Sequence, residues 1–242
     1  MNMIEVKGLT KRFGQHTAVD GVDLSVGKGE LFGLLGVNGA GKTTMIRMLS
    51  CLSLPTSGEA YMNGHSIITE ASAVKASIGV SPQTTAVAPN LTVRENLELM
   101  ARIYGLGRTE AAARAETVIA AHSLESVAER RAKVLSGGWQ RRLSIAMAVI
   151  SDPHILFLDE PTLGLDVLAR RELWKTVQGM KGQKTIVLTT HYLEEAEALC
   201  DRIAIMVNGH IRAVGTPTEL IASVDAPNFE EAFIRIAEGG AS

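Results

Sequence analysis

A glycine-rich segment of this chain has the residue types and spacing of a phosphate-binding loop. Gly36-Val37-Asn38-Gly39-Ala40-Gly41-Lys42-Thr43 fits the pattern Gly-x-x-x-x-Gly-Lys-Thr, and Thr44 follows directly. Glycines let backbone N–H groups wrap closely round phosphates, and we expect the ammonium of Lys42 to reach the β- and γ-phosphates. The hydroxyl of Thr43 is expected to bind magnesium. The segment therefore predicts a nucleoside triphosphate and Mg²⁺ as ligands.

A second segment, Leu135–Gln140, offers another site for an anion. It places Ser136, Gly137 and Gly138 where a helix is expected to begin, and the free N–H groups at the start of a helix bind anions. The phosphate-binding loop already provides for one nucleotide. The second segment therefore suggests a nucleotide that is held by another copy of the chain.

Two adjacent carboxylates follow an apolar run. Asp159 and Glu160 come directly after Ile155–Leu158. We expect Asp159 to hold magnesium through water, and Glu160 to polarise an attacking water or accept its proton. An Asp-Glu pair by itself fits an exposed acidic turn equally well. The presence of the phosphate-binding loop favours the functional interpretation.

Among the histidines, His191 has the position best suited to chemistry. It follows the apolar run Thr185–Thr190, and α/β proteins place their sites at the carboxyl ends of parallel strands. We expect His191 to hydrogen-bond a γ-phosphate and to sense its loss. The other histidines show no metal-ligand spacing and are interpreted as structural, namely His16, His65, His122, His154 and His210.

Gln83 and Phe13 each leave two interpretations open. Gln83 ends the segment Ile78–Gln83, just before a helical pattern begins. Its amide is expected to contact magnesium or water and to report the nucleotide state to the following helices, and a solvated loop glutamine is the alternative. Phe13 fits a ring stacked on a base or an ordinary strand aromatic. No Asn-Lys-x-Asp motif for guanine occurs, which favours adenine.

The elements that must position these residues alternate between strand and helix. Short apolar runs separated by helical patterns predict a parallel sheet with crossover helices. The expected strands are 30–35, 155–158, 185–190 and 202–207, and the expected helices are 42–50, 167–180 and 192–199. Residues 3–7 and 19–26 alternate between apolar and polar, which predicts an antiparallel β layer before the sheet.

A block of helical pattern interrupts this alternation. Residues 84–150 carry no strand signal, contain expected helices at 93–104 and 109–121, and have Thr92 as a candidate N-cap. We therefore divide the chain into an α/β core with its β layer (1–83 and 151–225), an inserted helical subdomain (84–150) and a tail (226–242). The tail predicts an amphipathic helix with Phe229, Phe233 and Ile236 on one face and Asn228 as its cap.

Composition limits the classes of protein to which the chain can belong. Its 242 residues, 46% hydrophobic and 21% charged, fit one soluble α/β domain. The net charge of −2 gives no electrostatic footprint for nucleic acid. Cys51 and Cys200 lack metal-ligand or disulfide-framework spacing, which fits a reducing cytosol. No apolar run approaches the roughly 18 residues of a membrane span, so we expect the chain to reach a membrane only through another polypeptide.

Taken together, the motifs resemble those of the nucleotide-binding subunits of ATP-binding cassette (ABC) transporters. Seven segments match in order along the chain. Phe13 looks like the adenine-stacking aromatic, Gly36–Thr43 the Walker A loop, Gln83 the Q-loop glutamine, Leu135–Gln140 the ABC signature, Ile155–Glu160 the Walker B strand with its catalytic glutamate, Leu163–Asp166 the D-loop, and His191 the switch histidine.

The resemblance implies a P-loop NTPase fold with a RecA-like core, and an ATPase that uses ATP and Mg²⁺. It implies a head-to-tail dimer, most simply of two identical copies, with each ATP between the Walker A loop of one copy and Ser136–Gly138 of the other. Gln140 and Asp166 are expected near the nucleotide, and Gln83 and Asp159 join Thr43 as magnesium ligands. The partner is an integral-membrane permease, which would hold the subunit at the inner face of the cell membrane.

The finer resemblance is to ATPases of type-2 exporters, which handle drugs, antibiotics, lipids and lipo-oligosaccharides. Phe13-Gly14, Leu163–Asp166 and the tail 228–237 carry it. The signature departs from the family pattern because Trp139 stands between Gly138 and Gln140. The alternative is an ABC-type ATPase acting on DNA or ribosomes, but the chain lacks coiled coils, a tandem cassette and a basic surface. A lone P-loop kinase would leave Ser136–Gln140 and His191 without a role.

Overall fold

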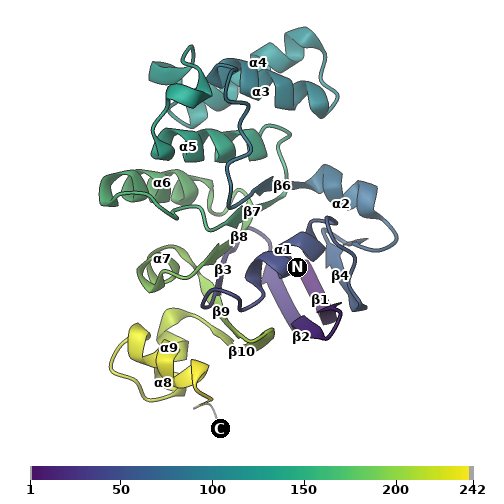
Figure 1. Ribbon diagram of the computed structural model, residues 1–242, viewed down its shortest axis with the longest axis vertical. Helices are drawn as coiled ribbons and strands as arrows, with labels where there is room; N and C mark the ends of the chain where they lie inside the picture. Colours follow the sequence, from purple (N-terminus) through teal and green to yellow (C-terminus); the bar gives the residue numbers. More distant parts are fainter. Residues whose placement is uncertain (1, 240–242) are drawn as a thin grey trace.

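A six-stranded sheet forms the centre of the structure, which is a computed structural model that describes residues 2–239 (Figure 1). Its strand order is β10-β9-β3-β8-β7-β6. The strands are β3 (Leu31–Leu35), β6 (Ile78–Ser81), β7 (Ile155–Asp159), β8 (Thr185–Thr190), β9 (Arg202–Val207) and β10 (His210–Gly215). All neighbours are parallel except β9 and β10, which pair antiparallel. The α/β prediction is confirmed, with one antiparallel edge strand that makes the sheet mixed.

A smaller antiparallel sheet lies beside it. Its order is β2-β1-β4-β5, and its strands are β1 (Asn2–Phe13), β2 (His16–Gly27), β4 (Ser57–Met62) and β5 (His65–Ser66). β1 pairs with both β2 and β4. Buried and exposed residues are interspersed along β1 and β2, with several register shifts between the two strands, as expected for irregular strands with one face on the core. The predicted antiparallel layer is therefore confirmed.

The central strands separate two hydrophobic cores. Every residue of β3, β7 and β8 is buried, because both faces of this parallel sheet are covered. Phe32 and Leu34 of β3 face a core shared with the small sheet and α1 (Lys42–Leu49), whereas Leu31 and Leu35 face a core shared with the remaining helices. In Figure 1, α1 and the small sheet lie on one side of the central sheet, and α6 (Val167–Met180) and α7 (Leu193–Leu199) lie on the other.

The segment between β6 and β7 is helical and lies at the far end of the molecule from the C-terminal helices (Figure 1). Its helices are α3 (Val93–Ile103), α4 (Arg108–Ala121) and α5 (Gly137–Ala148). Thr92 caps α3 as predicted, in a reciprocal pair with Glu95. Residues 84–92 form a loop instead of a helix, and a buried Asn96 fastens it with bonds to both backbone groups of Ala88.

The remaining helices cover the sheet and its C-terminal edge. They are α2 (Ala71–Ser77), α6 (Val167–Met180), α7 (Leu193–Leu199), α8 (Pro217–Ser223) and α9 (Phe229–Ala237). The bounds predicted for α6 are confirmed, whereas α2, α8 and β10 were not predicted. Asn228 caps α9, and Phe229 and Ile236 are buried while Phe233 is partly so. Of the helices that the structure describes, none has the length and apolar composition needed to cross a bilayer.

Candidate functional site

The glycine-rich loop joins β3 to α1 and is pressed against the core. A Cβ added to Gly36 would lie 2.3 Å from the carbonyl oxygen of Met206, and one added to Gly41 would lie 2.3 Å from that of Ala18. Gly41 also has a φ of 107°, a conformation that favours glycine. No side chain caps α1 at Gly41. The first N–H groups of α1 are therefore left for an anion.

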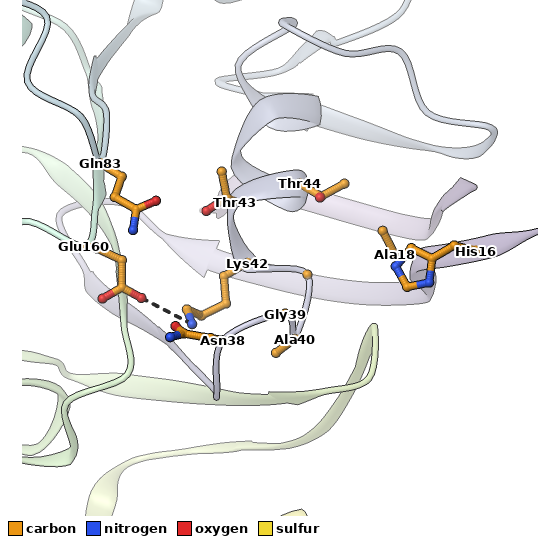
Figure 2. Close-up of a pocket in the computed structure, with 11 residues that line it drawn as sticks. His16, Ala18, Asn38, Gly39, Ala40, Lys42, Thr43, Thr44, Gln83 and Glu160 are labelled. Atoms are coloured by element: carbon orange, nitrogen blue, oxygen red, sulfur yellow. Dashed lines mark ion pairs between the residues drawn. The ribbon is translucent and has the colours of Figure 1, made fainter. Parts of the chain in front are cut away.

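The loop lines a cavity of about 410 Å³ that gathers residues from distant parts of the chain (Figure 2). Gln83 and Glu160 face the loop across this cavity, and His16 and Ala18 of β2 close its other end. The loop contributes Asn38, Gly39, Ala40, Gly41, Lys42, Thr43 and Thr44. The fold thus brings three of the predicted motifs to one place, because they follow β3, β6 and β7 at the carboxyl edge of the sheet.

Lys42 forms a buried ion pair in the cavity. Its ammonium lies 3.3 Å from Glu160 Oε1, and both side chains are about 95% buried, with 6% and 5% of their surfaces exposed. The ammonium also donates to the carbonyl oxygens of Gly36 and Val37, at 2.6 and 3.3 Å. These bonds hold a positive charge inside the loop, where a phosphate would be received.

Glu160 is held between Lys42 and the predicted switch histidine. Its Oε2 lies 2.7 Å from Nδ1 of His191. Its backbone N–H donates to both the carbonyl and the hydroxyl of Thr189. Glu160 has a φ of 49°, which costs a non-glycine residue about 1–2 kcal/mol. A carboxylate fixed in this way, with one face open to the phosphate cavity, is suited to accept a proton from water.

Asp159 and Thr43 meet beside this pair. Thr43 Oγ1 donates to Asp159 Oδ1 at 3.2 Å, and Thr189 Oγ1 donates to the same oxygen at 2.6 Å. A hydroxyl and one carboxylate, with the amide oxygen of Gln83 nearby in Figure 2, fit Mg²⁺. This ion binds oxygen through one or two carboxylates and takes further ligands from substrate phosphates and water. The described residues hold no cluster of three or more metal-binding side chains, so the donor set suits a phosphate-bound ion.

A buried arginine, Arg141, connects the Gln83 loop to α5, and no motif in the sequence predicts this contact. Arg141 is 5% exposed, and its guanidinium donates to the carbonyl oxygens of Pro82 and Gln83 at 2.7 and 2.6 Å. Burial lowers the pKa of Arg141, whereas the charges of Asp159 and Glu195 raise it. In the sequence, Arg141 precedes the largely apolar run 143–148 of the same helix, and all these residues are buried. A basic residue beside such a run was the available indication that Arg141 is buried. Arg141 thus links the signature helix to the cavity.

His16, which we expected to be structural, lies at the far end of the cavity. His16 lines the cavity, and it pairs across the β1–β2 hairpin with Phe13. The ring of Phe13 is 54% exposed and lies 5.1 Å from the ammonium of Lys11. The structure therefore places Phe13 next to the cavity lining, on a turn where a base can stack on it.

Ser136, Gly137 and Gly138 lie outside this cavity. Ser136 is the N-cap residue of α5, makes no side-chain cap bond and is exposed, as is Gly137. A Cβ on Gly138 would lie 3.0 Å from the Cβ of Ala169, so α5 packs closely on the start of α6. The hydroxyl and N–H groups of this segment therefore face solvent, away from the Lys42 loop of the same chain.

The two residues after these glycines turn inward. The amide of Gln140 donates to the carbonyl oxygens of Ala132 and Leu135, at 3.1 and 3.2 Å. Trp139 is partly buried against the core, and the guanidinium of Arg142 lies 4.8 Å from its ring centre. Both side chains brace the start of α5. The departure at Trp139 is thus accommodated by packing beside α6.

Asp166 begins α6 on the same surface as Ser136. Its Oδ1 accepts a hydrogen bond from Ala169 N at 2.9 Å, which makes it the N-cap. Val167 and Leu168 follow it and are 55% and 76% exposed. Leu168 and Ser136 line one small pocket of about 200 Å³. The signature serine and the D-loop therefore share an exposed, partly apolar surface.

Comparison with known proteins gives consistent similarities. Residues 19–163 match the family model described as ABC transporter. The daunorubicin resistance ATP-binding protein DrrA3 of Streptomyces coeruleorubidus is 41% identical over 240 residues, which cover 99% of this chain and 76% of that protein. Nod factor export ATP-binding protein I of Ralstonia nicotianae is 43% identical over 220 residues, which cover 90% and 68%. The mouse ATP-binding cassette sub-family A member 7 is 42% identical, and the match spans 12% of its length.

Solved structures show the same fold. An ATP-binding subunit of an ABC transporter superposes with a TM-score of 0.85 at 29% identity, covering 97% of this chain and 99% of that one. A dimeric ATP-binding cassette in a post-hydrolysis state, bound to ADP and Pi, superposes with a TM-score of 0.79 at 28% identity, covering 88% and 98%.

Proposed function

The chain belongs to the ABC transporter family, and we propose that it is a nucleotide-binding subunit that hydrolyses ATP to drive export through a separate membrane permease. The observation that carries this proposal is the chain of contacts from Lys42 through Glu160 to His191 beside the glycine loop. It combines a phosphate-binding cation with a fixed general base. The relatives named for drug resistance and Nod factor export favour export over an ATPase that acts on DNA or ribosomes.

The residues of the cavity divide the work of hydrolysis. The backbone of Gly36–Thr44 and the ammonium of Lys42 hold the phosphates. Thr43, Asp159 and Gln83 would hold Mg²⁺, which when bound neutralises phosphate charge. Glu160 would accept the proton of the attacking water. His191 holds Oε2 of Glu160 and, as the family resemblance implies, would contact the γ-phosphate.

The second half of each site comes from another copy. Ser136 and Gly137 are exposed and lie apart from the Lys42 cavity, so their hydroxyl and N–H groups are free to meet a γ-phosphate bound to a partner. A dimeric cassette is among the similar structures. We therefore assign a head-to-tail homodimer with two ATP at its interface, and place Asp166 and the exposed start of α6 at the same interface.

The permease contact is assigned to the segment 84–150 and the Gln83 loop. Arg141 connects this segment to the backbone of the cavity, so a change at the nucleotide moves both together. The location that follows is the cytoplasmic face of the cell membrane, with the permease as anchor. The cargo class taken from the relatives is a drug, an antibiotic, a lipid or a lipo-oligosaccharide.

The test is ATP hydrolysis by the purified full chain with Mg²⁺. Glu160→Gln keeps the shape of the side chain but removes the base, so kcat should fall at least about 100-fold while ATP binding persists and the dimer accumulates. The exposed Glu194→Gln serves as the matched control and should retain activity. Chelation of Mg²⁺ should stop turnover. Rapid hydrolysis by the Glu160 variant, or an inert wild-type chain, would contradict the proposal.

A further inference from the structure

A fully buried carboxyl lies behind the catalytic edge of the sheet and has no part in the mechanism described above. Glu195, on α7, is 0% exposed. Its Oε1 accepts a hydrogen bond from the indole N–H of Trp174 on α6, at 3.1 Å. Its Oε2 has no hydrogen-bond partner. Burying a carboxyl with one oxygen unpaired lowers the stability of the fold, so Glu195 has a cost that ordinary packing does not offset.

The hydroxyl of Thr162 faces this carboxyl. Thr162 is 2% exposed, and its Oγ1 also lacks a hydrogen-bond partner. The hydroxyls of Thr190 and Thr162 and the indole of Trp174 lower the pKa of Glu195, while burial, the largest influence, raises it. Two unused polar groups thus lie near each other, and a small shift of the Thr162 turn would join them.

Thr162 belongs to the tight turn that begins at the catalytic residue. Leu163 N donates to the carbonyl oxygen of Glu160, and Leu165 N donates to that of Thr162. Glu160 opens this turn in the left-handed conformation, with a φ of 49°. Such a conformation persists only where the surrounding structure holds it in place. On one side Thr189 does so, and on the other the unpaired hydroxyl of Thr162 lies near the carboxyl of Glu195.

The charges around Glu195 connect it to the rest of the site. Glu160, at the end of β7, raises the pKa of Glu195, and Glu195 in turn raises that of Arg141 on α5 and that of Cys200 after α7. From α6, Arg170 lies over the ring of Trp174 and pairs with the exposed Glu194. The carboxyl of Glu195 therefore faces the charge of Glu160 and influences the arginine that holds the Gln83 loop.

We propose, resting on the ATPase function above, that Glu195 is a positioning residue for hydrolysis. Its carboxyl ties α7 to Trp174 of α6 and lies beside the Thr162 turn, where it limits the movement of Glu160 away from His191. The ionised form serves this purpose best, because a carboxylate keeps the bond from Trp174 and can accept further bonds from the hydroxyls of Thr162 and Thr190 without carrying a donor of its own. Protonation of Glu195 loosens the turn and with it the catalytic carboxylate.

The experiment compares the steady-state ATPase kinetics and pH profiles of variants of the full chain with Mg-ATP. Glu195→Gln keeps the volume and an acceptor for Trp174 but cannot ionise. We expect kcat to fall about tenfold or more, since small displacements of a catalytic group are costly, with KM for ATP within about twofold of wild type. Because burial raises the pKa of Glu195, this carboxyl ionises at a higher pH than an exposed glutamate. In the wild type, kcat should rise with pH as Glu195 ionises. This rise should be absent from the kcat profile of Glu195→Gln. Glu194→Gln, exposed on the same helix, is the matched control.

Thr162 provides an independent test that does not remove the buried carboxyl. Thr162→Val should lower kcat with KM unchanged, and Thr162→Ser, which keeps the hydroxyl, should restore it. A Glu195→Gln chain with the kcat and pH profile of the Glu194→Gln control would overturn the proposal. If Glu195→Gln does not fold, an unchanged kcat in Thr162→Val overturns it equally. A wild-type chain without ATPase activity would instead contradict the proposed function.

Discussion

At the scale of single residues, the glycines of the phosphate-binding loop meet different surroundings. Gly39 has a φ of 83°, and a Cβ there would meet nothing within 4 Å. Gly41 has a φ of 107°, and a Cβ there would lie 2.3 Å from the carbonyl oxygen of Ala18. Alanine at either position carries the left-handed strain of about 1–2 kcal/mol. At Gly41 it must in addition push the loop away from β2.

This difference predicts unequal effects on nucleotide binding. Gly39→Ala should cost about 1–2 kcal/mol of unfolding free energy and weaken Mg-ATP binding modestly. Gly41→Ala should cost more and abolish detectable binding, because the start of α1 would move out of place. Urea unfolding and calorimetric titration with Mg-ATP measure both quantities. Equal losses in the two variants would show that strain alone, without the contact to Ala18, governs the loop.

Residues with a local motif around them could be predicted from the sequence, and residues defined by distant contacts could not. Glu160 and His191 each follow an apolar strand, and the structure brings them within hydrogen-bond distance. Arg141 and Glu195 gained no prediction, because a charged residue in a helix looks solvated until its burial is known. The position of His16 could not be predicted for the same reason, since only the pairing of β1 with β2 places it at the cavity.

At the scale of elements, one asparagine joins the loop after Gln83 to α3. Asn96 is 0% exposed, accepts a bond from Ala88 N at 2.8 Å, and donates to the carbonyl oxygens of Ala88 and Thr92 at 3.2 and 2.8 Å. The loop 84–92 thus keeps its backbone groups paired without a helix or strand of its own. Asn96 adds these bonds to the backbone bonds that join the loop to residues 132 and 133.

Removing that side chain should loosen the loop. Asn96→Ala leaves the N–H of the half-buried Ala88 without its partner and removes one of the two bonds to its carbonyl oxygen, so we expect a loss of about 1–3 kcal/mol of unfolding free energy. Asn90, exposed in the same loop, makes one bond to Lys133, and Asn90→Ala should change stability by less than about 0.5 kcal/mol. Urea unfolding compares the pair. A stable Asn96→Ala variant would mean that the loop is held by other contacts.

Elements with a strong periodic or apolar pattern were predictable, and short or edge elements were not. The helix 167–180 and the strands at 185–190 and 202–207 match the structure because they bury one stripe or both faces. Helix α2 has seven residues and buries only Val74 and Ser77, too few for a periodic signal. Strand β10 is half exposed, and its place at the sheet edge depends on the turn at Asn208-Gly209.

At the scale of the whole molecule, the two segments that we propose to bind phosphate lie on separate parts of one chain. The Lys42 cavity and the exposed start of α5 at Ser136 share no lining residue. In the proposed head-to-tail dimer, each copy would complete the site of the other. This arrangement makes a direct prediction about mixtures of variants.

Two inactive variants should restore activity when mixed. Lys42→Ala removes the cation of the loop, and Ser136→Glu places a negative charge where the partner's phosphate would bind. In a mixed dimer one of the two sites keeps both an intact loop and an intact signature, so ATPase activity should exceed the sum of the separate variants. Activity that stays additive on mixing, measured after equilibration with ATP, would exclude a composite site.

The hydrogen bonds from Arg141 to the carbonyl oxygens of Pro82 and Gln83 limit where chimeras between this chain and its relatives can be joined. Every residue type supplies a carbonyl oxygen at positions 82 and 83. The backbone conformation there must nevertheless place both oxygens within hydrogen-bond distance of the Arg141 guanidinium. A chimera that takes only the helices after residue 84 from a relative would combine the relative's residue at position 141 with this chain's own backbone at 82 and 83. The exchangeable cassette therefore starts before Pro82 and ends beyond Arg141, and chimeras cut inside those limits should lose allosteric communication before they lose their fold.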